Sequence, residues 1–586
     1  MSRIRWLVFD ALSAYFFASV LAILLTPVSM SGQGYAAEAP VALLAISSLL
    51  FFIVLTILRK RVSMQGWTLF GSSLLYGFMT VFEAGSAGFS YYTVTAAVLL
   101  ALLFWYLQRE GLLPFPYELA ERRTVALIAA AAVGVAVLIG WSTVIRYESY
   151  SSSTFDFGIF AQMYESMATT GQPLTTVERN ELMSHFSVHF SPIYYILLPF
   201  YMLFRTPAFL PAAQIAVVVS GVIPVYLLAK HLRFGEGMKL AWSMIYLTLP
   251  AFITPCFYDF HENLFLPPLL LWLLYFCERE KRVAAVGVAV LLLLVKEDAG
   301  IYLVAVGLYL LLARGRYPWG SILVGLGVVG FVVSVSIVHA IGGETLATSH
   351  YLNLIPAGHP GGLSGILRTV LVNPAYVLTQ VLSAEKLTFL LQMLLPLGLF
   401  PLLGRRLMDL VLLFPVVAIN LMTNYGYQYD VGYQYVFGTG ALLVFLAMKH
   451  ASEWKPGTAR NTLTLLAVLS SLFMCFSLNA RNVESIATSY SARKEAAAET
   501  TALLESIPKD ASVAVSTFLM PHLYAHPEVY MYPSVYRADM PETEYAVFDL
   551  RAGYFSEYDD AIAYYTERGY ELVETRGFAE LYRKGG

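Results

Sequence analysis

The chain has 586 residues, of which 58% are hydrophobic and 13% are charged, and its formal net charge is −3. A soluble domain carries about 25% charged residues, so this composition excludes an ordinary soluble protein and indicates a polytopic membrane protein. The near balance of acidic and basic residues also argues against a nucleic-acid-binding surface. Partners must therefore be sought in local clusters of polar residues.

The cysteines Cys256, Cys277 and Cys475 lie within or at the ends of apolar runs. Their spacing matches neither a disulfide framework nor a zinc site. We expect them to be small residues of the core.

Apolar segments long enough to cross a bilayer recur along the chain, and we predict about fifteen spans. The first follows Arg3 and Arg5, and its apolar run is longer than that of a usual signal peptide, which favours a retained span over a cleaved signal. The predicted spans are residues 6–28, 41–58, 66–82, 91–107, 124–145, 208–229, 238–256, 264–277, 283–295, 299–313, 319–340, 387–403, 407–421, 433–448 and 461–480.

Basic residues collect in every second connection between these spans, as the positive-inside rule requires of cytoplasmic loops. The connections 29–40, 83–90, 257–263 and 422–432 contain no Lys or Arg. This alternation holds only if residues 192–204 do not cross, so we expect an interfacial helix there. The N-terminus is then cytoplasmic, and the tail after the last span is extracytoplasmic. The basic connections hold Arg59, Lys60, Arg61, Arg109, Arg122, Arg123, Lys230, Arg233, Lys239, Arg279, Lys281, Arg282, Arg314, Arg316, Arg405, Arg406, Lys449, Lys455 and Arg460.

The composition changes in the tail, where ASVAVS, EVYMYP, EYAVFDL and YELVET are typical of short strands and YDDAIAYYTERG of a helix before the last of them. We therefore predict a mainly α protein, a polytopic transmembrane helical bundle with a small extracytoplasmic α/β domain at its C-terminus. The predicted divisions are a four-span extension (1–110), a transmembrane core (111–483) with a large extracytoplasmic loop (146–207), and the α/β domain (484–586).

A polar stretch at residues 146–192 interrupts the apolar segments, and Asp156 lies within it. Asp156 begins a pattern of apolar residues at helical spacing, so the acid falls on the apolar stripe of a short helix. Two compatible roles fit this position: a helix cap, because Ser153 precedes it in a Ser-Thr-Phe-Asp sequence, or a catalytic carboxylate. The apolar positions of the pattern are Ile159, Phe160, Met163 and Met167.

The predicted outer connections share one face of the bundle and collect ionisable and polar residues there. Such groups at membrane depth are costly and usually mark a site or an internal pair, so we predict a cavity on this face. The candidates are Gln162, Glu165, Arg179, His185, His189, Asp259, His261, Glu262, Asn263, Lys296, Glu297, Asp298, His350, His359, Lys386, Asn424, Tyr427, Gln428, Tyr429 and Asp430.

Each cluster has more than one interpretation. His185 and His189 are four residues apart, as metal ligands on a helix are, but HFSVHFSP alternates polar and aromatic residues and ends in proline, which favours a loop lining. Lys296 with its two acidic neighbours is either a self-neutralising tight loop or a phosphate-binding point charge. Asp259, His261 and Glu262 are too few for a metal site, so hydrogen bonds to a headgroup or sugar are the simpler use.

The sequence contains no convincing nucleotide-binding motif. GLGVVG at 325–330 matches the dinucleotide-binding glycine spacing but lies inside an apolar span with no strand before it, which indicates close helix contact. No P-loop is present, so an ATP-driven pump has no support. No cofactor is certain from the sequence, and a divalent metal stays open without support from ligand spacing.

The order of these motifs resembles a known superfamily. FDFGIFAQ in a polar loop, then HFSP before an aromatic in-plane stretch, then a span ending PVYLLAKHL is similar to the polyprenyl-phosphate-dependent glycosyltransferases of the GT-C superfamily. FDFGIFAQ, HFSP, YDFHEN and LVKEDAG together resemble the signatures of a prokaryotic family of polytopic membrane proteins classed as a domain of unknown function, over roughly residues 124–550. The four spans before residue 110 precede this part, and a WWDYG-like motif of the oligosaccharyltransferase branch is missing.

The resemblance implies that Asp156 is the general base and that residues 155–169 and 192–204 are in-plane helices, with Lys296 or Arg179 near a lipid phosphate. The implied activity moves a sugar from a polyprenyl-phosphate donor to an extracytoplasmic glycan, lipid or protein acceptor at a prokaryotic inner membrane. Substrate contacts are then expected from His185, His189, Asp259, His261, Glu262, Lys296, Glu297, Asp298, Tyr427, Gln428 and Tyr429.

Two other functions remain open. In a transporter or lipid flippase, Asp259, Lys296, Glu297 and Asp298 would form a relay, but symmetric halves with broken helices are expected there and no internal repeat is seen. In a non-catalytic envelope protein, the C-terminal domain would bind a partner.

Overall fold

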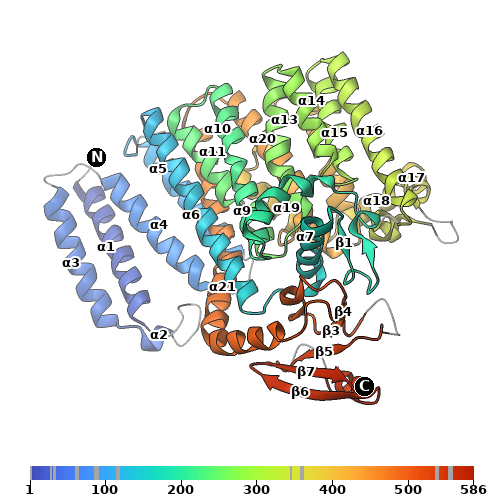
Figure 1. Ribbon diagram of the computed structural model, residues 1–586. Coiled ribbons are helices and arrows are strands. Elements are labelled where there is room, and N and C mark those ends of the chain that lie inside the picture. The colour runs from blue at the N-terminus through green and yellow to red at the C-terminus, as the bar shows by residue number, and fades with distance from the viewer. Residues whose placement is uncertain are drawn as a thin grey trace.

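The computed structural model describes residues 3–26, 30, 35–59, 65–84, 91–113, 119–343, 346–356, 362–534, 540–551 and 558–585. Lys60, Arg61 and His359 lie outside these residues. The fold is mainly helical with a small C-terminal sheet, as predicted (Figure 1).

The N-terminal helices form a group at one side of the molecule, drawn in blue in Figure 1. They pack on one another through buried aromatic and aliphatic side chains such as Phe9, Phe70 and Phe104. Phe78 joins the group to the core, because its ring lies 4.5 Å from that of Phe476. The helices are α1 (Arg3–Leu25), the short α2 (Tyr35–Glu38), α3 (Val41–Arg59), α4 (Gln65–Ala84) and α5 (Tyr91–Arg109).

The core begins with α6 and ends with the long helix α21. The two segments predicted to be in-plane helices, residues 155–169 and 192–204, form short helices. The elements are α6 (Glu121–Glu148), η1 (Thr154–Gly158), α7 (Ile159–Thr170), β1 (Leu174–Thr175), β2 (Met183–Ser184), η2 (His185–Ser187), η3 (Pro192–Ile196), α8 (Leu198–Phe204), α9 (Phe209–Ser220), α10 (Val222–His231), α11 (Glu236–Thr248), α12 (Pro250–Ile253), η4 (Thr254–Phe257), η5 (Glu262–Phe265), α13 (Leu266–Glu278), α14 (Arg282–Leu293), α15 (Ala299–Leu308), η6 (Tyr309–Ala313), α16 (Tyr317–Ala340), η7 (Leu346–Leu354), α17 (Gly362–Val372), α18 (Pro374–Val381), α19 (Ala384–Leu394), η8 (Leu395–Leu397), η9 (Phe400–Leu402), η10 (Leu407–Leu413), η11 (Val416–Leu421), η12 (Gly426–Tyr429), η13 (Gln434–Val436), α20 (Phe437–Glu453) and α21 (Thr458–Glu505).

Within the described residues, 8 helices are long and apolar enough to cross a membrane, or 9 if α11 and the bent segment after it form one span. This is fewer than the about fifteen spans expected from apolar runs alone. The difference lies mainly after residue 264, where the predicted spans coincide with shorter or interrupted helices. Prolines explain part of it, because Pro396 and Pro401 break the predicted span 387–403 into short turns.

Two of the three glycines of the GLGVVG stretch, Gly327 and Gly330, serve close helix contact, as predicted. A Cβ on Gly327 of α16 would lie 2.7 Å from the Gly300 carbonyl oxygen of α15, and a Cβ on Gly300 would meet the Gly327 oxygen at 2.5 Å. Gly330 likewise leaves no room beside Leu293. Small residues here let two apolar helices approach backbone to backbone.

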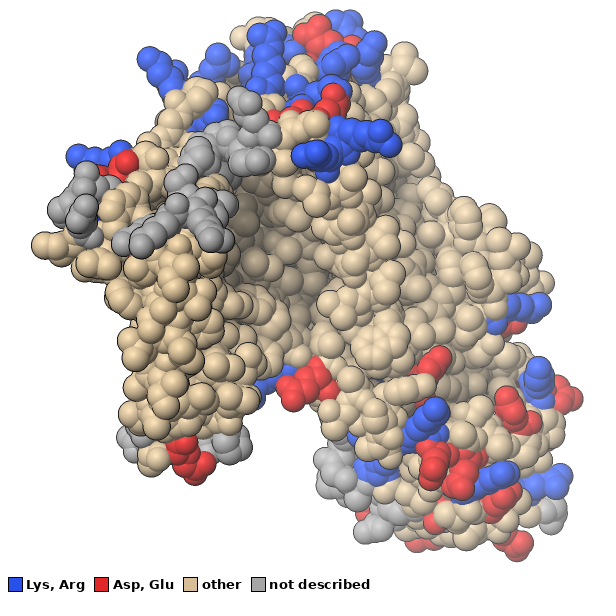
Figure 2. Space-filling view, turned by 90° about the vertical axis from the view of Figure 1, so that its left-hand side faces the viewer, with Lys and Arg blue, Asp and Glu red and all other residues tan. Residues whose placement is uncertain are grey.

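Ion pairs bring together the connections that were predicted to be cytoplasmic. Lys230 lies 2.6 Å from Glu121, and Glu278 meets both Arg314 at 3.5 Å and Lys449 at 2.9 Å. Figure 2 shows Lys and Arg gathered at the end of the molecule away from the C-terminal domain, above a broad band with few charges. Such a band suits a surface that faces lipid.

The C-terminal domain is a five-stranded sheet in the order β4-β3-β5-β7-β6, in which β3, β4 and β5 are parallel and β6 and β7 antiparallel. The predicted strands and helix are present, whereas β7, in the polar sequence AELYRK, escaped prediction. Helix α21 runs through residue 484 without a break and reaches the sheet. The strands are β3 (Val513–Val515), β4 (Val529–Met531), β5 (Tyr545–Asp549), β6 (Tyr570–Arg576) and β7 (Ala579–Lys584), with η14 (Met520–Leu523) after β3 and α22 (Tyr558–Thr566) after β5.

The large loop of the core covers the edge strand β4. Thr176 donates its hydroxyl to the Val529 carbonyl at 2.6 Å and accepts the Val529 N–H at 3.1 Å. Asn180 does the same with both backbone groups of Met531, at 2.7 and 2.9 Å. These side chains supply the pairing that an edge strand otherwise leaves open, so loop and sheet are held together.

Candidate functional site

A cavity of about 600 Å³ lies where the large loop meets the ends of the core helices. One part of its lining is polar and comes from the large loop, from residues 258–262 and from the link between α14 and α15. The other part is apolar and comes from α15, α16, α17 and the segment around η11. The apolar lining consists of Ile301, Phe331, Val335, Leu363, Ile366, Leu367, Phe414, Ala418 and Ile419.

Asp156 lies in this cavity with a strained backbone. Its φ of 66° and ψ of −68° place it in the γ-turn region that non-glycine residues rarely adopt. Such strain is retained where the surrounding structure imposes it, often at functional sites. Two hydrogen bonds between Thr154 and Thr517 of the C-terminal domain, both 3.0 Å, fix the backbone just before this turn.

The carboxylate of Asp156 contacts a phenol and an imidazole. Tyr258 donates its hydroxyl to Oδ2 at 2.6 Å, and Nε2 of His261 lies 3.3 Å from the same oxygen. The side chain remains 32% exposed. Ser153 makes no side-chain cap to this helix, so the contacts of Asp156 are those of a cavity group and not of a capping box.

The surroundings of Asp156 favour its protonated form more than water does. Burial raises the pKa of the Asp156 carboxyl, although His261 and the hydrogen bond from Tyr258 act in the opposite direction. Burial also lowers the pKa of His261, which favours a neutral imidazole. A carboxylate with a raised pKa is a stronger base than an ordinary one.

Lys296 is paired inside the protein. Its Nζ lies 2.8 Å from Oε1 of Glu262, whose other oxygen accepts a hydrogen bond from Tyr194. Burial disfavours the charge on Lys296, but Glu262, Glu297 and Asp298 raise its pKa above the ordinary value. The carboxylate that pairs with Lys296 is thus Glu262, from outside the Lys296–Asp298 triplet, and Lys296 also lines the cavity where a phosphate could approach.

The two histidines of HFSVHFSP each pair with a carboxylate. Nδ1 of His185 lies 3.0 Å from Glu178, and Nδ1 of His189 lies 2.9 Å from Glu297. No group of three or more His, Cys, Asp or Glu side chains in the described part of the chain is arranged to hold a metal ion. The histidines thus line the cavity as hydrogen-bonded groups.

The structure brings most of the predicted site residues to this cavity. Two of the expected substrate contacts do not line it. Asp259 lies 3.1 Å from Arg146. The ring of Tyr429 faces the ammonium of Lys386, whose Nζ is 5.1 Å from the ring centroid. The predicted residues that line the cavity are Asp156, Arg179, His185, His189, His261, Glu262, Lys296, Glu297, Asp298, His350, Tyr427 and Gln428.

Tyr427 of the aromatic group near Asp156 was predicted from the sequence, but Tyr258, which donates to the Asp156 carboxylate, was not. Tyr258 was part of the YDFHEN motif but was not chosen, although its neighbours were. Around it, the rings of Tyr258 and Tyr433 lie 4.7 Å apart and those of Tyr433 and Tyr427 4.4 Å. His350 stacks on Tyr425 at 4.0 Å. The sequence signal for this aromatic rim is Tyr427-Gln428-Tyr429, which Tyr433-Gln434-Tyr435 repeats.

Comparison with known proteins agrees with this architecture. A family profile described as "Predicted membrane protein (DUF2079)" matches residues 146–555. Among curated proteins, none matches the sequence. The crystal structure of ArnT from Cupriavidus metallidurans bound to undecaprenyl phosphate is 14% identical and superposes with a TM-score of 0.51, over 80% of this chain and 100% of ArnT. Apo ArnT from the same organism is 14% identical with a TM-score of 0.48, over 79% and 99%. The likeness to the first structure shows a GT-C-like fold.

Proposed function

The chain belongs to the DUF2079 family of predicted membrane proteins, and we propose that it is a glycosyltransferase that moves a sugar from a polyprenyl-phosphate donor to an extracytoplasmic acceptor. The observation that carries the proposal is Asp156, a carboxylate that opens into a cavity with one polar and one apolar wall. ArnT, a GT-C glycosyltransferase of similar fold, was solved with undecaprenyl phosphate, which supports a lipid-linked donor.

The two walls suit the two ends of such a donor. A polyprenyl chain requires an apolar groove that continues into the bilayer, and residues of α16 and α17 provide an apolar wall. The phosphate and sugar require polar groups, which the opposite wall supplies. Lipid exposure near the cavity is supported by α17, because Leu367 and Leu371 are exposed although apolar.

The chemistry assigned to Asp156 is that of a general base. In an inverting transfer, the carboxylate accepts the proton of the acceptor hydroxyl while that oxygen attacks the anomeric carbon of the donor. Tyr258 and His261 hold the carboxylate in position. Lys296 and Arg179 are the cations of the lining that can offset charge on the departing polyprenyl phosphate.

The orientation of the protein is part of the proposal. The basic connections gather at the end away from the sheet domain, which by the positive-inside rule is cytoplasmic. The cavity and the C-terminal domain then face the extracytoplasmic side. Helix α8 supports an in-plane position, since Phe200, Leu203 and Phe204 are exposed and apolar.

The test is the variant Asp156→Asn, assayed with a labelled polyprenyl-phosphate sugar in proteoliposomes. Loss of the base should lower the transfer rate about 100- to 10,000-fold while the protein still folds and inserts. Asp430→Asn is the matched control, because Asp430 is an exposed carboxylate of an outer connection that accepts the Gly432 N–H at 2.7 Å and does not line the cavity. Undiminished transfer by Asp156→Asn would refute the assignment.

A further inference from the structure

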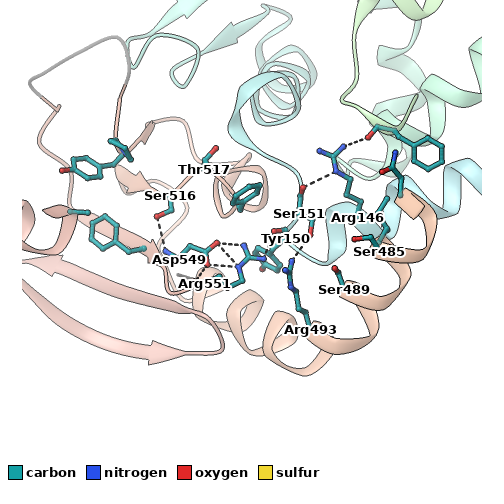
Figure 3. A pocket seen from close by; sticks show the side chains of 18 residues that line it. Arg146, Tyr150, Ser151, Ser485, Ser489, Arg493, Ser516, Thr517, Asp549 and Arg551 are labelled. Atoms are coloured by element: carbon teal, nitrogen blue, oxygen red, sulfur yellow. Dashed lines mark hydrogen bonds and ion pairs between the residues drawn. The ribbon is translucent and has the colours of Figure 1, made fainter. Parts of the chain in front are cut away.

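A second cavity, of about 340 Å³, lies between the C-terminal domain and the core, apart from the one that holds Asp156 (Figure 3). Its walls are α21, the end of α6 with the residues after it, and one edge of the sheet. None of its lining residues belongs to the polar set predicted from the outer connections. The transfer reaction proposed above makes no use of it.

One wall is a polar stripe on α21. Asn482, Ser485, Ser489 and Arg493 line the cavity and follow one another at intervals of three or four residues. Residues at this spacing lie on one face of a helix, so this face turns amide, hydroxyl and guanidinium groups toward the space. Figure 3 shows Ser485, Ser489 and Arg493 in order along the helix.

The opposite wall is formed where the parallel strands end. Ser516 and Thr517 follow β3, Tyr532 and Pro533 follow β4, and Asp549 is the last residue of β5. In open α/β sheets, ligands bind outside the carboxyl ends of parallel strands, because the loops there diverge and leave a crevice. This cavity occupies that position.

The charges of the lining favour an anion. Arg146, Arg493 and Arg551 line the cavity, and Asp549 is the one carboxylate among the described lining residues. Arg551 pairs with Asp549 and donates to the Tyr150 carbonyl at 2.8 Å, and Arg146 pairs with Asp259, outside the lining, at 3.1 Å. Arg493 donates to the Ser151 hydroxyl at 3.0 Å. These contacts orient the guanidinium groups, which bind carboxylates and phosphates in forked pairs.

The remaining lining suits a sugar. Several serine and threonine hydroxyls can both donate and accept hydrogen bonds, as the hydroxyls of a sugar require. Aromatic rings of Phe518, Tyr532 and Phe548 add apolar faces. We propose that this cavity binds an anionic saccharide, a sugar that carries a carboxylate or a phosphate group.

The cavity is linked to Asp156 by short contacts. Arg146 donates to the Tyr258 carbonyl at 2.6 Å, and Tyr258 donates to the Asp156 carboxylate at 2.6 Å. Thr517 accepts the N–H of Thr154, two residues before Asp156, at 3.0 Å. In a step that rests on the proposed function, the saccharide held here is a non-reacting part of the acceptor.

The experiment measures binding to the detergent-purified full-length protein by isothermal titration calorimetry. The probes are glucuronic acid, glucose 1-phosphate, glucose and inorganic phosphate. We expect at least one of the charged sugars to bind about 10-fold more tightly than glucose or inorganic phosphate, since a charge-assisted hydrogen bond adds to those of the hydroxyls. Preference for glucuronic acid identifies a carboxylated sugar, and preference for glucose 1-phosphate a phosphorylated one.

Variants locate the binding. Arg493→Gln should lower the affinity for the charged sugar about 10-fold. Ser489→Ala, which only removes a hydroxyl, should lower this affinity less. Lys494→Gln is the matched control, because Lys494 is the next cation on α21 but does not line this cavity. Asp156→Asn should leave binding unchanged, and this holds even if the proposed transfer activity is absent. No binding of either charged sugar, equal binding of glucose, or full affinity in Arg493→Gln would overturn the proposal.

Discussion

The large loop contributes residues to both cavities, and these cavities differ in the charge of their lining and in the extent of their apolar wall. The larger one is lined by the carboxylates of Asp156, Glu178, Glu262, Glu297 and Asp298 and has an extended apolar wall. The smaller one is lined by three guanidinium groups, several hydroxyls and aromatic rings, and Asp549 is the one carboxylate among its described lining residues. A carboxylate-rich space next to lipid suits proton transfer on a membrane-anchored substrate, whereas a cationic, hydroxylated space suits recognition of a polar anion. If both proposals hold, the same loop contributes residues to a site of chemistry and to a site of binding.

The largest expected effect concerns the ion pair in the wall of the larger cavity. Lys296→Met leaves the buried carboxylate of Glu262 without its cation and should lower the free energy of unfolding by about 3–5 kcal/mol. Unfolding in mixed micelles measures this loss. The double variant Lys296→Met/Glu262→Leu removes both charges and should regain most of it. If the single variant is as stable as the parent protein, the pair is not buried as the structure has it.

A smaller effect is expected at Tyr258, whose hydrogen bonds with Arg146 and Asp156 connect the linings of the two cavities. Its hydrogen bond lowers the pKa of Asp156, so Tyr258→Phe should raise that pKa. The carboxylate then protonates at higher pH, and the acidic limb of the pH–rate profile should move up by about half to one pH unit, the equivalent of about 1 kcal/mol. Tyr427→Phe is the control, because Tyr427 lines the cavity while its ring packs on Tyr433 and Tyr425. A limb that stays in place would mean that Asp156 is not the titrating base.

The smallest effect is expected at the seam between loop and sheet. Asn180→Ala removes both hydrogen bonds to Met531 and should weaken the attachment of β4 by about 1–2 kcal/mol. Faster amide exchange in residues 526–534, measured by mass spectrometry, would report this. Asn482→Ala, an exposed amide of α21, should leave the exchange of these residues unchanged. Unaltered exchange in Asn180→Ala would show that other contacts hold the seam.

Much of the architecture follows from local properties of the chain. Long apolar runs identify the first helices, and the alternation of basic connections groups residues that the structure joins in ion pairs, such as Lys230 with Glu121. The polar motifs led to most of the acidic, basic and histidine side chains that line the larger cavity. Hydropathy and charge act residue by residue, so they can be read without knowing which segments meet.

The tertiary structure alone decided which groups meet. Asp259 and His261 are two residues apart, yet the first faces Arg146 and the second faces Asp156. Likewise, Pro396 and Pro401 shorten a run that hydropathy alone presents as one span. No sequence motif predicted the smaller cavity. Its walls come from α6, α21 and three strands, and the parallel pairing of these strands brings distant hydroxyl and guanidinium groups together. Contacts between residues hundreds of positions apart depend on the whole fold, and no local pattern encodes them.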